Sequence, residues 1–243
     1  MSDEQTNLAQ VKDLSVSFMT DAGSIKAIDK INFPIPRKPV VGVVGESGSG
    51  KSVTARSLIK LLPETATTSG VIYLSNREGN EQLDVLSLSG EDLRRMRGSE
   101  AAMVFQEPNS VLNPVYTIGW QIEEGLRAHG MKDKKELRAK SVDILKKVGL
   151  YEAKDKLVKK YSLGMRQRLG IAQALMENPD TLILDEPMNG LDNACVKMIR
   201  EILLDLKEEG KTILLVSHNF EDIKCLCDKI YEIDHGKLML PAD

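Results

Sequence analysis

Residues 45–52 read Gly45-Glu46-Ser47-Gly48-Ser49-Gly50-Lys51-Ser52 and fit the pattern G-x-x-x-x-G-K-[ST] without a gap. An apolar run at residues 40–44 precedes them, and a helix-like stretch at residues 53–62 follows. In that context glycines let successive backbone N–H groups converge on phosphate oxygens, and the helix adds its positive N-terminal end. A chance Gly- and Ser-rich turn would rarely carry the Lys-Ser pair and both flanking elements. We therefore expect a nucleotide site in an α/β protein, where Lys51 neutralises the terminal phosphates and Ser52 offers its hydroxyl to Mg²⁺.

Length and composition indicate a globular domain with a real core. The chain has 243 residues, of which 42% are hydrophobic, and this length suits one α/β domain, either uniform or with two lobes. The 33 Lys and Arg residues nearly balance the 36 Asp and Glu residues, so the formal charge is −3. No overall field favours nucleic acid or an anionic membrane, and we expect no nucleic-acid partner.

The cysteines and the N-terminal residues indicate a reduced, cytoplasmic chain. Cys195, Cys225 and Cys227 give no disulfide framework, and Cys225 and Cys227 lack further ligands for a metal site. Residues 1–7 are polar and acidic, unlike a signal peptide. No stretch approaches the roughly 20 apolar residues that span a bilayer, so we expect any membrane role to depend on a partner.

Alternating apolar and polar residues predict antiparallel strands at residues 9–18 and 25–35. Ser89 and Asp92 have the spacing of a capping box and predict a short helix after them. Further strands are expected at residues 40–44, 71–74, 83–86 and 101–105.

The pattern becomes helical from residue 108 to about residue 178, which predicts a helical lobe inserted into a sheet domain. Strand-like runs return at residues 181–184 and 212–216. Between them lies a helix whose apolar stripe consists of Val196, Ile199, Leu203 and Leu206. Strands on both sides of a helix predict a parallel sheet.

Two adjacent carboxylates, Asp185 and Glu186, end the apolar run at residues 181–184. Because side chains alternate along a strand, the two point in different directions. Asp185 suits Mg²⁺, and Glu186 suits a water as general base or positioning group. The alternative is that Asp185 and Glu186 are acidic only because the strand ends in solvent. This alternative is weaker in a chain that also carries a complete phosphate-binding segment.

Three further segments accompany these motifs in a fixed order. They read Ser162-Leu163-Gly164-Met165-Arg166-Gln167-Arg168, Asn189-Gly190-Leu191-Asp192 and Ser217-His218. With them the chain resembles, over nearly its whole length, the nucleotide-binding subunits of ATP-binding cassette (ABC) transporters. The resemblance implies a P-loop NTPase fold of class α/β, with a mixed central sheet, an N-terminal antiparallel β-subdomain and an inserted α-helical subdomain. It implies one domain over residues 1–243, with the core and β-subdomain at 1–106 and 178–243 and the helical subdomain at 107–177.

The resemblance also implies roles for individual residues. Ser162 and Gly164 would grip the γ-phosphate of ATP bound by a second copy, which is reasonable because a helix N-terminus attracts anions. Phe18 matches an aromatic residue that stacks on adenine, although its strand alternation would equally make it a core residue. Catalysis falls to Glu186, His218 and Gln106; Mg²⁺ binding to Ser52, Gln106 and Asp185; and ATP binding to Phe18, Gly45, Ser47, Gly48, Ser49, Gly50, Lys51, Ser52, Val53, Ser162, Gly164 and Asp192. Taken alone, His218 would suit an ordinary strand end, and Gln106 would carry almost no information.

The two halves of the chain resemble different groups within this family. Residues 1–150 resemble oligopeptide and dipeptide importer ATPases, and residues 151–243 resemble bacitracin- and lantibiotic-type exporter ATPases. This predicts a recombined or engineered chimera with a crossover near residues 149–160. Leu163 replaces a glycine common in the family motif, and residues 36–39 (Pro-Arg-Lys-Pro) replace a turn that usually contains glycine.

These observations predict an ATPase subunit that powers peptide transport with ATP and Mg²⁺. Its partners would be a second nucleotide-binding subunit, identical or different, and integral membrane permease subunits, which would place it peripherally on the inner face of the cell membrane. An alternative is a soluble or chimeric ATPase domain that binds ATP without coupling to transport. A DNA-repair or translation ATPase would usually add a coiled coil or a second cassette. A GTPase would need an Asn-Lys-x-Asp motif, a kinase would not need Ser162, and a non-enzymatic scaffold stays open.

Overall fold

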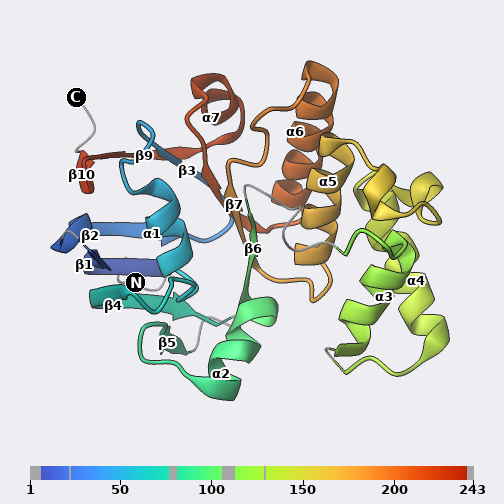
Figure 1. Ribbon diagram of the computed structural model, residues 1–243, viewed down its shortest axis with the longest axis horizontal. Helices are drawn as coiled ribbons and strands as arrows, with labels where there is room; N and C mark the ends of the chain where they lie inside the picture. Colours follow the sequence, from blue (N-terminus) through green and yellow to red (C-terminus); the bar gives the residue numbers. More distant parts are fainter. Residues whose placement is uncertain (1–6, 22, 77–80, 106–112, 129, 240–243) are drawn as a thin grey trace.

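The computed structural model describes residues 7–21, 23–76, 81–105, 113–128 and 130–239. They form two β-sheets and a set of helices (Figure 1). An antiparallel sheet lies at one end and a helical lobe at the other, with a second, mostly parallel sheet between them. The predicted fold class is confirmed.

The central sheet has six strands in the order β10-β9-β3-β8-β7-β6. All neighbouring pairs are parallel except β10 with β9. Strands β3, β7 and β8 are buried at every position, as expected of a parallel sheet covered on both faces. The bounds are β3 (Val40–Val44), β6 (Ala101–Val104), β7 (Thr181–Asp185), β8 (Thr212–Val216), β9 (Lys229–Asp234) and β10 (Lys237–Met239).

The second sheet is antiparallel and has the order β2-β1-β4-β5. Its first two strands pair over almost their whole length, as the alternation predicted. The fourth is shorter than expected, because the chain turns after Asp84. The bounds are β1 (Asn7–Thr20), β2 (Gly23–Pro36), β4 (Ala66–Ser75) and β5 (Gln82–Asp84).

The central sheet divides the interior into two apolar cores. Along β3, Val41 and Val43 face the core shared with the antiparallel sheet, whereas Val40 and Val44 face the core shared with the helices. Helix α1 (Lys51–Ser57) lies on the first side, and α5 (Leu163–Ala174), α6 (Asn193–Glu208) and α7 (Phe220–Leu226) lie on the second (Figure 1). The strand period of two thus assigns each side chain to one core.

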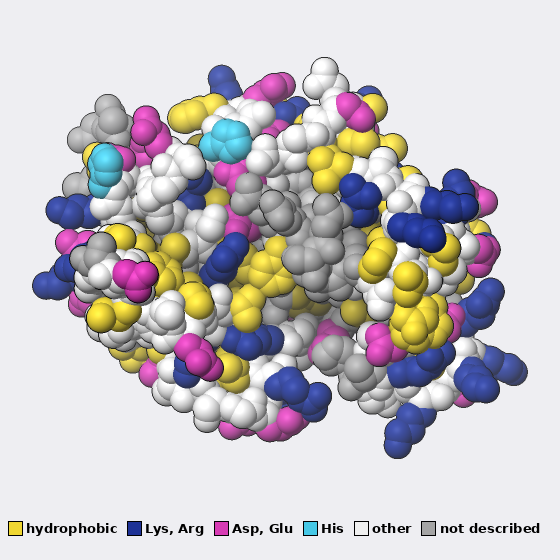
Figure 2. Space-filling model, viewed as in Figure 1, with side chains coloured by type: hydrophobic (Ala, Val, Ile, Leu, Met, Phe, Trp, Pro, Cys, Tyr) yellow, Lys and Arg dark blue, Asp and Glu magenta, His cyan; other side chains and the backbone are white. Residues whose placement is uncertain are grey.

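The helical lobe follows β6 in sequence and returns to the sheet through α5. Besides α5 it contains α3 (Ile118–Ala128), α4 (Lys134–Lys147), η4 (Tyr151–Ala153) and η5 (Val158–Lys160). Asp133 begins α4 by accepting hydrogen bonds from the backbone N–H groups of Lys135 and Glu136. Figure 2 shows many Lys and Arg side chains on the right of the molecule, where α3 and α4 lie.

Two local expectations were wrong in detail. The helix expected at residues 53–62 ends at Ser57, and the chain turns there, with Lys60 in the left-handed region at φ 53°. Helix α2 (Gly90–Arg95) begins after Ser89 as predicted, but the Ser89 side chain makes no capping hydrogen bond. The segment η2 (Met96–Glu100) follows it and contains a kink, with non-helical backbone angles at Arg97 and Gly98.

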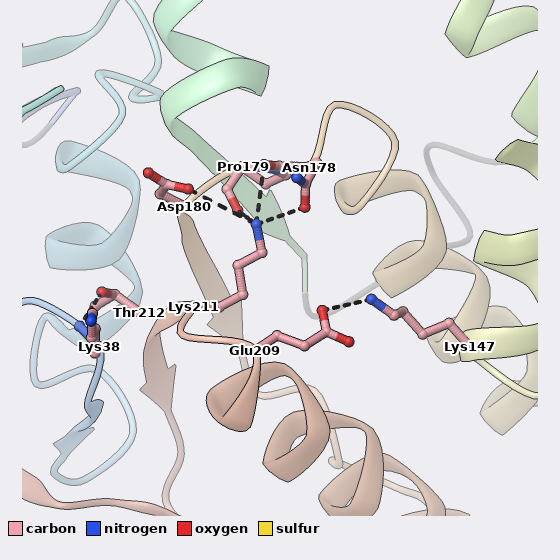
Figure 3. Close-up of polar contacts among 8 residues, drawn as sticks. All are labelled: Lys38, Lys147, Asn178, Pro179, Asp180, Glu209, Lys211 and Thr212. Atoms are coloured by element: carbon pink, nitrogen blue, oxygen red, sulfur yellow. Dashed lines mark hydrogen bonds and ion pairs between the residues drawn. The ribbon is translucent and has the colours of Figure 1, made fainter. Parts of the chain in front are cut away.

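A buried lysine holds together two loops at the amino-terminal edge of the central sheet (Figure 3). Lys211 Nζ donates to the backbone oxygens of Asn178 (3.1 Å) and Pro179 (2.6 Å) and to Asn178 Oδ1 (2.7 Å). At the same edge the Lys38 backbone N–H donates to Thr212 Oγ1 at 2.7 Å. Lys38 has φ 75° and therefore takes the left-handed conformation, which glycine would adopt in this turn at a lower steric cost.

Lys147 of α4 and Glu209, which ends α6, form an ion pair at 2.6 Å between the helical lobe and the core (Figure 3). Both side chains are more than a third exposed, so the pair adds little stability. Within the described ranges, no helix combines the length and apolar character needed to cross a bilayer.

Candidate active site

Residues 45–52, called the phosphate loop from here on, connect the carboxyl end of β3 to the start of α1. A Cβ at Gly45 would lie 2.0 Å from the Ile233 carbonyl oxygen, and one at Gly50 would lie 2.8 Å from the Ala27 carbonyl oxygen. Both glycines also have positive φ, 150° and 108°. Glycine is therefore required at both ends of the turn that delivers Lys51.

The phosphate loop borders a cavity of about 860 Å³, which is within the range for small-molecule sites. Lys51 is 6% exposed. Its Nζ donates to the backbone oxygens of Gly45 (2.8 Å) and Glu46 (2.7 Å). An ammonium group has three donors, so one N–H remains for an anion in the cavity. The lining consists of Val44, Gly45, Glu46, Ser47, Gly48, Lys51, Ser52, Glu186, Asn189, His218, Phe220 and Glu232.

Ser52 and Asp185 meet beneath this cavity, although 133 positions separate them in the sequence. Ser52 Oγ donates to Asp185 Oδ1 at 2.7 Å. Asp185 is fully buried, and its Oδ2 accepts no hydrogen bond from the described residues. The nearest cation is Arg56, whose Nη2 lies 3.8 Å from that oxygen. Burial raises the pKa of Asp185, while the Ser52 hydrogen bond and the Arg56 charge oppose the rise.

These oxygens fit Mg²⁺, which binds through one or two protein oxygens and completes its shell with water and phosphate oxygens. The buried Asp185 Oδ2 supplies an acceptor without a hydrogen-bond donor, and the Ser52 hydroxyl lies beside it. Over the described ranges, no group of three or more His, Cys, Asp or Glu side chains could hold a metal ion alone. The donor set thus suits an ion that arrives with a nucleotide.

Glu186 and His218 also line the cavity. Glu186 Oε2 lies 2.8 Å from His218 Nδ1. Glu186 is 9% exposed, whereas more than half of the His218 side chain is open to solvent. Glu186 also has φ 51°, a left-handed backbone that non-glycine residues rarely adopt. Asp185 faces Ser52 and Glu186 lines the cavity, so the two side chains differ in direction as expected. Glu186 lies beyond the end of β7 and has a left-handed backbone, so strand alternation is not the cause.

Ser162, Gly164 and Asp192 do not line this cavity. Ser162 begins α5, and its Oγ accepts a hydrogen bond from the Met165 backbone N–H at 3.3 Å. Asp192 begins α6 by accepting from the Cys195 N–H at 2.8 Å, and this bond lowers the pKa of Asp192. Gly164 is buried, and a Cβ there would lie 2.5 Å from Cys195 Sγ. The two helix starts therefore pack against each other away from their own chain's cavity.

The remaining expected site residues have different placements. Ser49, Gly50 and Val53 belong to the phosphate loop and α1 but do not line the cavity. Phe18 is half-buried on β1, where it packs against the core of the antiparallel sheet. Gln106 lies outside the described residues.

Five residues that line the cavity were not among the expected site residues: Val44, Glu46, Asn189, Phe220 and Glu232. Val44, Glu46 and Asn189 stand in or beside quoted motifs, whereas the sequence reasoning gave Phe220 and Glu232 no place at all. Phe220 is 73% exposed at the start of α7, and Asn219 caps that helix by accepting from the Glu221 N–H at 2.9 Å. The order Asn219, Phe220, Glu221, Asp222 carries a helix-start signature, an N-cap followed by acidic residues. That signature could have revealed both α7 and the aromatic side chain beside His218.

Comparisons with known proteins give a consistent picture. Residues 28–189 match the family described as ABC transporter. A putative peptide import ATP-binding protein of Brucella abortus (strain 2308) is 41% identical over 226 residues, covering 91% of this chain and 67% of that protein. The oligopeptide transport ATP-binding protein OppD of Bacillus subtilis (strain 168) is 34% identical, covering 96% of this chain and 65% of OppD.

Solved structures agree with the sequence relatives. The dimeric structure of a post-hydrolysis state of the ATP-binding cassette MJ0796 bound to ADP and Pi superimposes with a TM-score of 0.83. The two sequences are 25% identical, and the superposition covers 96% of this chain and 97% of the MJ0796 chain. The alignment with the peptide-import relative covers 91% of this chain, so it includes residues from both halves. The comparisons therefore do not support the expected exporter-like second half or a crossover near residues 149–160.

Proposed function

Since this chain belongs to the ABC transporter family, we propose that it is an ATP-hydrolysing subunit whose turnover powers peptide transport through membrane permease subunits. The observation that carries the proposal is the convergence, around one cavity, of Lys51, the Ser52–Asp185 pair and the Glu186–His218 pair. Phosphoryl transfer needs these components: cationic neutralisation of phosphate charge, metal ligands and a group that orients water. The sequence relatives named as peptide import and oligopeptide transport ATP-binding proteins support peptide import.

In the proposed ATP complex, backbone N–H groups of the phosphate loop and the third N–H of Lys51 bind the phosphates. Ser52 and Asp185 would hold Mg²⁺, which neutralises charge on the transferring phosphoryl group. Gln106 would contribute to the same ion and to the attacking water. Phe18 would stack on adenine.

Glu186 is the proposed general base. One of its oxygens contacts His218 Nδ1, so the other is available to accept a hydrogen bond from water in the cavity. As the water oxygen bonds to the γ-phosphorus, its proton passes to Glu186 and the bond to the ADP oxygen breaks. His218 Nδ1 contacts Glu186, and more than half of the His218 side chain is open to solvent. In the proposed complex His218 would hold that carboxylate and contact the γ-phosphate.

A second copy, identical or different, completes the proposed site. Ser162 and Asp192 are exposed and do not reach their own chain's cavity. In a head-to-tail pair, Ser162 and Gly164 would approach the γ-phosphate held by the partner, with Asp192 between the two sites. Dimers among the similar solved structures support this arrangement. The helical subdomain at residues 107–177 would contact the permease, on the inner face of the membrane.

The test combines the ATPase rate with size-exclusion chromatography. The parent should hydrolyse Mg-ATP, and Glu186→Gln should lower kcat by about 10²–10⁴, the usual contribution of a general base. Glu186→Gln should also shift to a dimer with Mg-ATP, because closure occurs without turnover. Glu232→Gln is the matched control, since Glu232 lines the same cavity without contacting His218. A Glu186→Gln protein that turns over at the parent rate would remove the assigned base.

A further inference from the structure

Two helices carry the loops on either side of the catalytic cavity, and an ion pair joins them. Arg200 lies on α6 and Asp222 on α7. Arg200 Nε and Nη2 donate to Asp222 Oδ1 at 3.0 and 2.6 Å. Asp222 is 2% exposed, and the Arg200 side chain is largely buried. A buried carboxylate needs such a partner, so the two helices are held in one relative position.

His218 is attached to α7 through a short, well-defined connection. Ser217 follows β8, and its backbone N–H donates to the Val43 oxygen at 3.2 Å. The Asn219 N–H donates to Ser217 Oγ at 3.0 Å, and the Asn219 side chain caps α7. His218 lies between these two fixed residues. Its ring position therefore depends on the position of the first turn of α7, which contains Asp222.

Helix α7 has only seven residues and few anchors. Ile223 and Leu226 pack into the core, whereas Phe220 is exposed. Apolar contacts alone permit small rotations, since they are not directional. The paired hydrogen bonds from Arg200 define both a distance and a direction for Asp222.

Helix α6 begins at Asp192, and Arg200 lies about two turns further along it. Residues 186–192, between β7 and α6, form the Asp192 loop, and residues 217–219, between β8 and α7, form the His218 loop. Residues of both loops line a polar cavity of about 210 Å³, which Arg200 and Asp222 also line, together with Glu186 and His218. From this geometry we propose that Arg200 and Asp222 are positioning residues that hold His218 against Glu186 and fix the His218 loop relative to the Asp192 loop. The catalytic consequence rests on the proposed ATPase function.

The experiment compares a change in the middle of α6 with a change near its carboxyl end. Arg200→Gln removes the link, and Arg200→Lys keeps a charge and one donor. Lys207→Gln is the matched control, because Lys207 on the same helix pairs with Asp228 at the same distance, 2.6 Å, but further from the catalytic loops. For Mg-ATP hydrolysis we expect Arg200→Gln to lower kcat about 10- to 100-fold, the scale of a 1 Å misplacement. KM for ATP should stay within about twofold, because the phosphate loop is untouched, and Arg200→Lys should recover most of the loss.

A second readout needs no turnover. The chain has three histidines, so ¹⁵N-histidine NMR of the nucleotide-free protein, assigned with His218→Gln, reports the His218 ring directly. In Arg200→Gln the His218 nitrogen and proton shifts should move or broaden, and in Lys207→Gln they should match the parent. Asp222→Asn provides a second variant if Arg200→Gln leaves Asp222 too poorly paired to fold. In that variant Arg200 keeps Glu221 as an acidic neighbour at 3.6 Å.

The outcomes separate this inference from the proposed function. A parent chain that binds Mg-ATP but never hydrolyses it would count against the proposed function, while the NMR comparison would still test the positioning role. Unchanged His218 resonances in both folded Arg200→Gln and Asp222→Asn would overturn the positioning role. An equal loss of kcat in Lys207→Gln would overturn it as well, because the effect would then belong to the general attachment of α6.

Discussion

At the scale of single residues, the phosphate loop holds its own lysine in place. Lys51 bonds to two carbonyl oxygens of the loop, so its charge is positioned before any nucleotide arrives. Preorganised charge of this kind acts without reorganisation when the ligand binds.

We therefore expect Lys51→Met to weaken Mg-ATP binding by at least about tenfold, because a charged hydrogen bond is worth about 1.5–3 kcal/mol. Isothermal titration with Mg-ATP measures this. Lys60→Met is the control, since Lys60 also bonds to two carbonyl oxygens, those of Leu86 and Leu88, away from the cavity. Equal affinity in the parent and Lys51→Met would contradict the assignment.

The cysteines should differ sharply in reactivity. Burial raises the pKa of Cys227 to about 12, with its Sγ against the Gly42 backbone, whereas Cys225 is exposed. At pH 8 Cys227 is then a neutral thiol, so iodoacetamide should label Cys225 first and Cys227 only on unfolding. Because the folded-state pKa is raised, the stability linked to the neutral thiol is lost as the pH rises from about 9 toward 12. Mass spectrometry of timed samples checks the order, and equal labelling rates would refute it.

Sequence patterns predicted the residues whose chemistry is local. Lys51, Ser52, Asp185, Glu186 and His218 all stand at motif positions, and the structure gathers them at one edge of the central sheet. The approaches of Arg56 to Asp185 and of Phe220 to the phosphate loop could not be read in the same way. They depend on how distant strands align, which no local spacing encodes.

At the scale of elements, the packing of α5 against α6 explains one glycine. A Cβ at Gly164 would lie 2.5 Å from Cys195 Sγ and 3.0 Å from its Cβ. Overpacking of a core costs about 1–3 kcal/mol. We expect Gly164→Ala to carry this cost and to lower the melting temperature by about 2–4 °C for each kcal/mol. Adding Cys195→Ala should recover part of the loss, since the sulfur atom is removed. Calorimetry of the two single variants and the double variant gives the coupling.

Gly119→Ala is the contrasting change, because a Cβ there would meet only the Lys154 oxygen at an ordinary 3.6 Å. In helix α3 it should be neutral or stabilising by up to about 1 kcal/mol. A Gly164→Ala protein as stable as the parent would show that α5 and α6 can separate without cost.

Elements with a clean period were predicted, and those with a mixed period were not. Strands β3, β7 and β8 are uninterrupted apolar runs, and β1 and β2 alternate over many residues. Strand β9 has one fully buried residue, Ile233, among six, so its pattern is weak. It is a strand because β3 pairs with it, which is a tertiary cause.

At the scale of the whole molecule, the exposed start of α5 predicts how two copies meet. Ser162→Arg should leave Mg-ATP binding within about twofold of the parent, because Ser162 does not line its own cavity, but should prevent the ATP-dependent dimer of Glu186→Gln. Light scattering of Glu186→Gln/Ser162→Arg with Mg-ATP measures this. Ser162→Ala is the control, since it also loses the 3.3 Å cap but adds no bulk. A dimer in both would refute the contact.

The overall layout was predictable from the order of patterns, and its assembly was not. A strand-rich start, a helical middle and a strand-rich end describe the molecule in Figure 1. The side-by-side placement of β3 with β8 and β9, however, joins segments about 170 to 190 residues apart. That strand order is determined by the packing of the two apolar cores against the two faces of the central sheet.

The left-handed backbone of Glu186 has a consequence for laboratory evolution. A glycine or asparagine would adopt φ 51° more readily than glutamate does. Libraries of this chain screened only for heat resistance would therefore be enriched in replacements at position 186, and the survivors would be stable proteins that lack the proposed general base. Screens that demand ATP hydrolysis should instead retain Glu186 and accumulate stabilising replacements at other positions. Sequencing both pools would therefore reveal a trade-off between stability and activity at position 186.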